Sequence, residues 1–259
     1  MWQWWNCLEE QVALPRKVLR VNVDETAVRF YMPQRKGLVP KRRRGGPSRA
    51  QDAARRQQRS CVTHVAAICD DTAVQPSLPQ VFIGNEAVLQ VAAVRLVQPA
   101  LHKNVILLRR KSGWVNKDFL VNYVKLLAAC LEPFAVDCQP ILRWDALPAH
   151  CAPPVLRAAA RAGLWVVIVP AKMTWLLQPL DTDVFSRYKQ YLRRRYLELL
   201  CDAHDGRVAA TIITLAMNDA CRKVLQGHAW AAVLLRNSFG AVQRSVKRSM
   251  REELELDQV

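Results

Sequence analysis

Long apolar runs, paired cysteines and acidic residues are all scarce in this chain of 259 residues. No run reaches the length of about 18 apolar residues that a membrane helix needs, so we expect none. The cysteines include no C-x-x-C pair and no cysteine–histidine cluster with zinc-ligand spacing, which excludes a zinc ribbon and a disulfide framework. We interpret all eight as reduced core thiols: Cys7, Cys61, Cys69, Cys130, Cys138, Cys151, Cys201 and Cys221.

The N-terminus lacks the basic region followed by an apolar stretch that marks a secretory signal peptide. Three tryptophans (Trp2, Trp4 and Trp5) stand there, but Glu9 and Glu10 follow them closely. Because neither a signal peptide nor a membrane helix is apparent, we expect a soluble, intracellular protein.

Acidic residues number only 22 against 38 lysines and arginines, which gives a formal net charge of +16. Such an excess favours a polyanionic partner, nucleic acid first, or an anionic membrane surface. The chain is otherwise ordinary for a globular protein, with 51% hydrophobic and 23% charged residues. Its length suits one large α/β domain, with or without a helical appendage, and a collagen or a coiled coil is excluded.

More than half of the net charge lies in one segment, 35–59, which we call the basic loop. It holds ten basic residues against one acid, Asp52, and it is broken by glycine and proline. Two interpretations stay open: a solvated hairpin tip or nuclear-import signal, and an arm that contacts phosphates. The candidate nucleic-acid-binding residues are Arg35, Lys36, Lys41, Arg42, Arg43, Arg44, Arg49, Arg55, Arg56 and Arg59.

The hydrophobic pattern predicts a sheet flanked by helices. Alternation or a short apolar run predicts strands at 18–26, 27–32, 61–69, 79–84, 140–145 and 165–169. Helical spacing predicts helices at 117–134, with Asn116 as N-cap, and at 153–163. Three strands followed by helix, strand, helix, strand is the order of a ribonuclease-H-like mixed sheet, an α/β fold.

The end of the chain is predicted to be helical and basic. From Leu180 to about Leu200 one apolar stripe is set against arginines on the other faces, and two more helices are expected at 207–227 and 229–251. We therefore expect three parts: an N-terminal extension (1–17), an α/β domain with the basic loop inserted (18–200) and a basic helical C-terminal segment (201–259).

Three aspartates stand where such a sheet would bring chain segments together. Asp24 lies in the first strand, Asp145 ends a later strand and Asp181 begins a helix. Converging carboxylates repel one another unless a hard cation such as Mg²⁺ or Mn²⁺ neutralises them. Two such ions about 3.5–4 Å apart can cleave a phosphodiester. From composition and spacing alone this signal is weak, because most aspartates at strand ends are structural or solvated.

Four sequence blocks in a fixed order surround these aspartates: VNVDET (21–26), SGW (112–114), WDALPAH (144–150) and LLQPLD (176–181). They resemble the conserved blocks of DDE-superfamily endonucleases, most closely the pogo, jerky and centromere-protein-B-like branch of the mariner-type transposases. The resemblance covers about 18–196. It implies a ribonuclease-H-like fold, DNA transposition with two Mg²⁺ or Mn²⁺ ions, and catalytic, metal-holding roles for Asp24, Asp145 and Asp181.

Three further residues are expected to support these carboxylates without holding the metal. Glu25 should point to the opposite face of its strand from Asp24, because side chains alternate. His150 could orient a water or the DNA, although a histidine in a strand-exit loop is more often structural. Gln178 is expected to shape the turn that aims Asp181.

Four tryptophans lie within this region: Trp114, Trp144, Trp165 and Trp175. Each could stack on a flipped base. Packing in the interior or at the rim is the commoner use of a tryptophan, and the sequence alone selects none of the four as a base reader.

The sequence also departs from the pattern of the family it resembles. Ala146 follows Asp145 where the family usually has asparagine. The family's transposases carry N-terminal helix-turn-helix modules, whereas 23 residues precede Asp24. We therefore expect a separated catalytic domain, a truncated gene product or a domesticated remnant that lacks a separate DNA-recognition module, and we assign it no recognition of transposon ends.

The expected partner is DNA, the expected location is the nucleus, and no membrane contact is expected. A homodimer is compatible with the sequence. Two alternatives of other classes stay open: a non-catalytic DNA-binding protein derived from a transposase, and a ribosomal or other RNA-binding basic protein whose aspartates are incidental.

Overall fold

The computed structural model describes residues 7–12, 15–29, 61–87, 89–202, 209–226 and 230–236. The basic loop (35–59) lies outside these ranges, so the role expected of its ten basic residues stays a prediction. Within the described ranges, no helix is long and apolar enough to cross a membrane.

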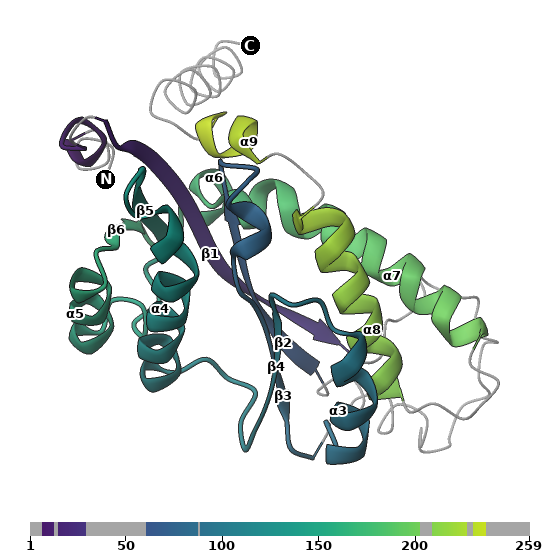
Figure 1. Cartoon of the computed structure of the whole chain (residues 1–259). Coiled ribbons are helices and arrows are strands. Elements are labelled where there is room, and N and C mark those ends of the chain that lie inside the picture. Colours follow the sequence, from purple (N-terminus) through teal and green to yellow (C-terminus); the bar gives the residue numbers. More distant parts are fainter. Residues whose placement is uncertain are drawn as a thin grey trace, which may run out of the picture.

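Six strands form one mixed sheet in the order β4-β3-β2-β1-β5-β6 (Figure 1). The strands are β1 (Lys17–Arg29), β2 (Cys61–Cys69), β3 (Gln80–Asn85), β4 (Val105–Arg110), β5 (Cys138–Asp145) and β6 (Trp165–Val169). β2 runs antiparallel to β1 and β3, while the pairs β1–β5, β5–β6 and β3–β4 are parallel. The sheet has the ribonuclease-H-like mixed arrangement that the element order predicted.

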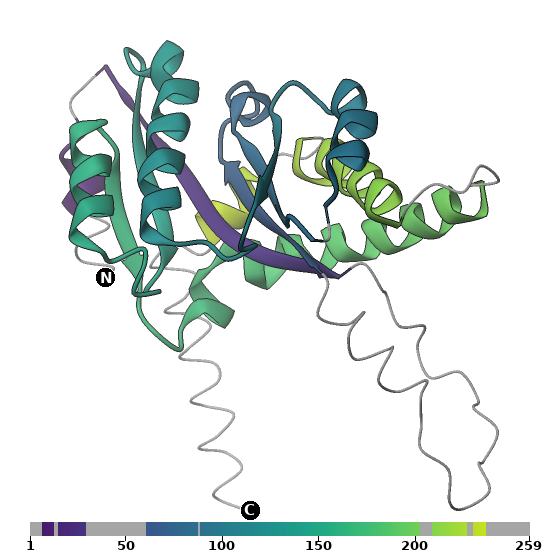
Figure 2. The same ribbon diagram turned by 90° about the horizontal axis from the view of Figure 1, so that it is seen from below.

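Helices cover both faces of this sheet. They are α3 (Val91–Val97), α4 (Lys117–Leu131), α5 (Pro153–Arg161), α6 (Thr174–Leu177), α7 (Phe185–Cys201), α8 (Ala209–Ala220) and α9 (Ala231–Arg236). Two π-helical turns adjoin them: η4 (Leu180–Val184) leads into α7, and η5 (Cys221–Gln226) follows α8. Figure 2 shows α4 and α5 on one side of β1 and α3, α7 and α8 on the other.

The alternation of β1 assigns its side chains to the two faces. Leu19, Val21 and Val23 are fully or almost fully buried in the core beneath α4 and α5. Because successive side chains of a strand point to opposite faces, Asn22 and Asp24 point to the face that α7 and α8 cover. Both are buried polar residues.

Several predicted elements are confirmed. Asn116 caps α4, since its Oδ1 accepts a hydrogen bond of 3.0 Å from the Phe119 amide. α5 begins with its paired prolines and is followed by Gly163, whose φ of 70° lies in the left-handed region that favours glycine. β6 has the predicted bounds. The stripe predicted on α7 is buried at Phe185, Tyr188 and Leu192.

Other predictions were wrong. The expected strands 18–26 and 27–32 are one strand as far as Arg29, because no turn residue interrupts them and β1 pairs with β2 from Val21 to Arg29. β4 and α3 were not predicted at all. β4 lies at the edge of the sheet and shows no alternation of buried and exposed residues, and α3 has only seven residues.

The cysteines are only partly the core thiols that were expected. All eight are free, but only Cys69, Cys138 and Cys221 are buried. Cys151 and Cys201 are exposed, because the first lies in the loop after β5 and the second ends α7.

Candidate active site

Asp24 and Asp145 lie on neighbouring parallel strands. The β1–β5 ladder ends at the pair Asn22 and Arg143, and each aspartate follows its strand's member of that pair by two residues. Asp24 is 7% exposed, whereas 27% of the Asp145 side chain is accessible. The parallel register therefore brings the two carboxylates to the same end of the paired strands.

Asn22 ties the turn that carries Asp181 to the sheet. Its Nδ2 donates a hydrogen bond of 3.0 Å to the Arg143 carbonyl on β5, and its Oδ1 accepts one of 3.0 Å from the Leu180 amide. Leu180 opens η4, and Asp181 is the next residue. One fully buried amide thus sets the position of Asp181 relative to β1 and β5.

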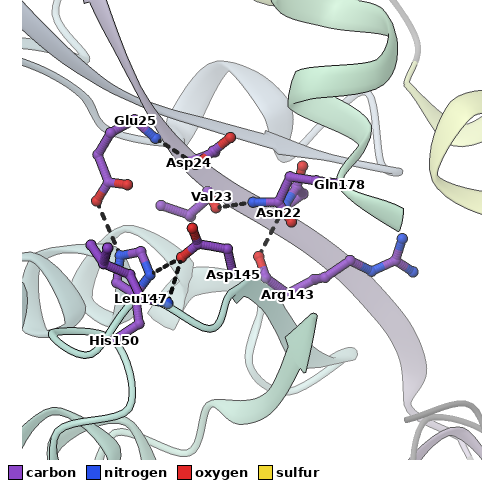
Figure 3. Close-up of polar contacts among 9 residues, drawn as sticks. All are labelled: Asn22, Val23, Asp24, Glu25, Arg143, Asp145, Leu147, His150 and Gln178. Carbon is purple, nitrogen blue, oxygen red and sulfur yellow. Dashed lines mark hydrogen bonds and ion pairs between the residues drawn. The ribbon is translucent and has the colours of Figure 1, made fainter. Parts of the chain in front are cut away.

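Gln178 makes a second connection of the same kind. Its Nε2 donates a hydrogen bond of 3.2 Å to the Val23 carbonyl (Figure 3). Its side chain is fully buried. The residue lies in the short turn between α6 and η4. It therefore ties the turn before Asp181 to β1, and the role expected of it in aiming Asp181 stays a prediction.

Asp24 and Asp181 share an acidic surrounding. Burial, followed by the negative charges of Asp181 and Glu25, raises the pKa of Asp24 well above its ordinary value. Burial also raises the pKa of Asp181; Lys189 opposes this rise and the charge of Asp145 adds to it. The charge of Asp181 thus disfavours ionisation of Asp24, whereas a hydrogen bond from Asp24 lowers the pKa of Asp181. A cation placed between the two carboxylates would lower both pKa values.

A fully buried histidine joins Asp145 to Glu25. His150 Nδ1 lies 2.5 Å from Asp145 Oδ1, and its Nε2 lies 3.1 Å from Glu25 Oε1 (Figure 3). The ring stacks on Trp144 with a centroid separation of 4.8 Å and an interplanar angle of 7°. Burial alone would lower the pKa of His150, but hydrogen bonds and charge from the two carboxylates raise it to about 10. The imidazole is therefore charged at neutral pH and donates to both.

The contact with His150 also determines the protonation state of Asp145. Burial would raise its pKa, but the hydrogen bond and charge of His150, together with the Leu147 amide, lower it. Both hydrogen bonds end on Oδ1, the second at 3.1 Å. Asp145 is therefore ionised at neutral pH, with one oxygen held by protein donors and Oδ2 left for another ligand.

His150→Gln should lower the free energy of unfolding by about 1.5–3 kcal/mol, because hydrogen bonds to charged groups are lost. The folded pKa of His150 lies above its unfolded value of 6.5, so its contribution is fully present below pH 6.5 and is lost as the pH rises through about 10. Asp145 has a lowered pKa, so its share is present above about pH 3.8 and is lost as the pH falls through the folded pKa.

Urea denaturation of both proteins between pH 4 and pH 10 measures this difference. It should be largest below pH 6.5 and shrink towards pH 10. The pKa of buried His64, which burial lowers to about 3, affects both proteins alike and cancels in the difference. A difference that stays constant over the whole range would contradict the expectation.

The carboxylates suit a hard cation in kind, because Mg²⁺ and Mn²⁺ prefer oxygen ligands. They are nevertheless not assembled for one: among the residues that the structure describes, no three histidine, cysteine, aspartate or glutamate side chains form a group that could hold a metal ion. Asp24 interacts with Asp181, while Asp145 is bonded to His150. The three candidates come from β1, β5 and η4 to one part of the sheet, without forming a ready site.

Sequence reasoning missed Asn22. The residue is an amide between two buried valines, Val21 and Val23, inside an apolar strand. A buried amide requires hydrogen-bond partners. This requirement could have indicated that Asn22 links β1 to other segments. Its partners, however, lie 121 and 158 residues further along the chain.

The mixed sheet, with Asp24 inside β1 and Asp145 at the end of the neighbouring parallel strand β5, defines a ribonuclease-H-like domain. A family model described as DDE superfamily endonuclease matches residues 66–238. The match covers well over half of the chain, which therefore belongs to the DDE superfamily of endonucleases. Asp145 and Asp181 lie within the matched residues, and Asp24 precedes them.

Solved structures of the Mos1 transposase are also similar to the chain. The paired-end complex with the left transposon end has 14% identity and a TM-score of 0.43, and the paired-end complex with Mn has 14% identity and a TM-score of 0.44. Each alignment covers 92% of this chain, which spans 60% of the length of the Mos1 chain. No curated protein matches the chain.

Proposed function

We propose that this chain is the catalytic domain of a DDE-type endonuclease or transposase that cuts and joins DNA strands with divalent metal ions. Asp24, Asp145 and Asp181 would hold the ions. The observation that carries the proposal is that β1, β5 and η4 bring these carboxylates to one part of a ribonuclease-H-like sheet in a member of this superfamily. Bound Mg²⁺ or Mn²⁺ would activate the nucleophile and stabilise the leaving oxygen of a phosphodiester.

The chain's own residues prepare the carboxylates for this task. His150 holds Oδ1 of Asp145 and keeps that carboxylate ionised. Asn22 and Gln178 hold the segment that presents Asp181. Because metal ligands must be deprotonated, the raised pKa of Asp24 makes metal compete with a proton there, and metal affinity should rise with pH.

DNA as the partner is proposed from charge. The formal net charge is +16, and α7 presents exposed cations next to η4: Arg187, Lys189, Arg193 and Arg194. Such residues bind phosphates without regard to base sequence. The basic loop would add to this surface, and a DNA substrate fits a nuclear location.

A second candidate is a non-catalytic DNA-binding protein derived from a transposase. Ala146 favours it, because the family resemblance leads one to expect asparagine at that position. That the described residues include no group of three ligands arranged for a metal ion favours it as well. The two functions differ in whether the chain binds divalent metal.

Mg²⁺ or Mn²⁺ should raise the unfolding temperature of the wild type and not that of Asp24→Asn. A ligand present at about 100 times its Kd stabilises the folded state by about 2.7 kcal/mol. Without metal, Asp24→Asn should be at least as stable as the wild type at neutral pH. The folded pKa of Asp24 is raised, so the wild type loses stability as the pH rises from 3.8 through that pKa, and asparagine does not.

Thermal unfolding with and without each metal gives the result directly. Asp118→Asn, an exposed change in the first turn of α4, is the matched control and should respond to metal like the wild type. If neither metal changes the unfolding temperature of the wild type, the non-catalytic DNA-binding protein is favoured.

A further inference from the structure

The structure separates the four tryptophans considered as base-stacking candidates into two kinds. Trp144 is fully buried, and Trp165 is half-buried against Ile141 and Val167. Trp114 and Trp175 are 83% and 72% exposed. An indole left in water contributes little to folding, so the two exposed rings are the ones free to bind something else.

Trp114 lies on a loop whose backbone is fixed by hydrogen bonds to β2 and within the loop. Thr63 Oγ1 on β2 donates a hydrogen bond of 2.8 Å to the Gly113 carbonyl, and the Trp114 amide donates one of 3.2 Å to Ser112 Oγ. Two residues later Asn116 caps α4. The backbone is thus anchored on both sides of Trp114, while its side chain points into solvent.

Two hollows meet at this ring. The first measures about 510 Å³ and lies between Trp114 and the segments 25–27 and 147–149. The second measures about 440 Å³ and is lined by Trp114 together with Lys111 and Asn85. Both volumes fall in the range of small-molecule sites, about 300–1,000 Å³.

The first hollow adjoins the candidate active site. Glu25 lines it and follows Asp24 directly in β1, and Leu147 lines it and donates its amide to Asp145. The remaining walls are mostly apolar: Ala27, Val115, Pro148 and Ala149. A flat apolar ligand seated against Trp114 would therefore lie beside Glu25 and close to the loop that binds Asp145.

We propose that Trp114 is a stacking platform for one unpaired nucleobase of the DNA strand that the carboxylates engage, with the base seated in the first hollow. This inference rests on the proposed function. An aromatic face and apolar walls accept any base, since every base has a π-face. Lys111, exposed at the second hollow, supplies a cation for the adjoining phosphate.

An unpaired base suits this place for an energetic reason. A nucleotide taken out of the duplex loses its stacking, at a cost of a few kcal/mol. Stacking on the exposed indole of Trp114 offsets part of this free-energy cost. A fully paired duplex offers no free base face and gains nothing from Trp114.

The test compares two fluorescein-labelled DNAs, a single-stranded oligonucleotide and the fully paired duplex, by anisotropy in EDTA. Trp114→Ala should bind the single strand between about fivefold and about a hundredfold more weakly than the wild type. Trp114→Phe should recover part of the loss, and duplex binding should change little. Trp175→Ala, which removes the other exposed indole among the residues that the structure describes, is the matched control and should bind like the wild type.

A 2-aminopurine base in the single strand gives a second measurement, because stacking quenches its fluorescence. Wild type and Trp175→Ala should quench it, and Trp114→Ala should not. Equal single-strand affinity of Trp114→Ala and the wild type, an equal loss in Trp175→Ala, or no single-strand binding by the wild type would each overturn the inference. The assay contains no divalent metal, so a failure of metal-dependent cleavage appears separately and speaks only against the proposed function.

Discussion

Asp145→Asn should lower metal-dependent nicking of supercoiled plasmid by roughly 10²–10³-fold, the loss typical when one stabilising group is removed from an active site. Asparagine is close to aspartate in shape but lacks the charged oxygen that would hold the metal. In the wild type, His150 keeps this carboxylate ionised and occupies only Oδ1. The substitution thus removes charge from Oδ2, where a ligand would bind.

DNA affinity of Asp145→Asn should change little when it is measured in Ca²⁺ or without metal. The cationic surface that binds phosphates is untouched, and the loss of one negative charge favours binding slightly. Asp118→Asn should nick like the wild type. Equal nicking by wild type and Asp145→Asn would indicate contamination or another active site. If neither nicks but both bind DNA, the non-catalytic candidate is favoured.

Asn22→Ala should reduce both stability and metal-dependent nicking. Its side chain satisfies the Arg143 carbonyl and the Leu180 amide, and each buried group left without a partner costs about 1–3 kcal/mol. We expect the free energy of unfolding to fall by about 2–5 kcal/mol. Because the Leu180 amide anchors η4, Asp181 should also lose its fixed position.

Val23→Ala is the matched control for this variant. Val23 is fully buried on the same strand, but its side chain lies in the core beneath α4 and α5. Its truncation should cost comparable stability without releasing η4. Nicking per folded molecule, measured at a temperature where both variants are folded, should fall only in Asn22→Ala. Equal nicking by the two variants would show that Asn22 matters for folding alone.

Local patterns predicted the elements that depend on local chemistry. The asparagine cap of α4 and the continuous apolar run of β6 needed no tertiary information. β4 could not be found in this way, because the sequence VILLRR lacks alternation and its neighbour in the sheet, β3, decides its pairing. Tertiary contact overrides local propensity at such positions.

The candidate site likewise has a part that the sequence predicted and a part that depends on tertiary contacts. The sequence placed Asp24, Asp145 and Asp181 at element ends that a mixed sheet brings together, and alternation placed Glu25 away from Asp24. The link from Glu25 through His150 to Asp145 depends on side chains 125 residues apart. Only the register between β1 and β5 and the course of the loop after β5 determine such contacts, and neither can be obtained from residue spacing.

The π-helical turn η4 fixes the phase between Asp181 and the helix that follows it. Each α-helical residue turns the chain by about 100°, and a π turn holds one residue more than the α-helical bonding pattern. The buried side of α7, which includes Phe185 and Tyr188, is committed to the sheet. Deleting one residue between Asp181 and Phe185 would therefore leave α7 in place and swing the carboxylate around the helix axis. Along this segment, evolution can exchange side chains far more freely than it can change length.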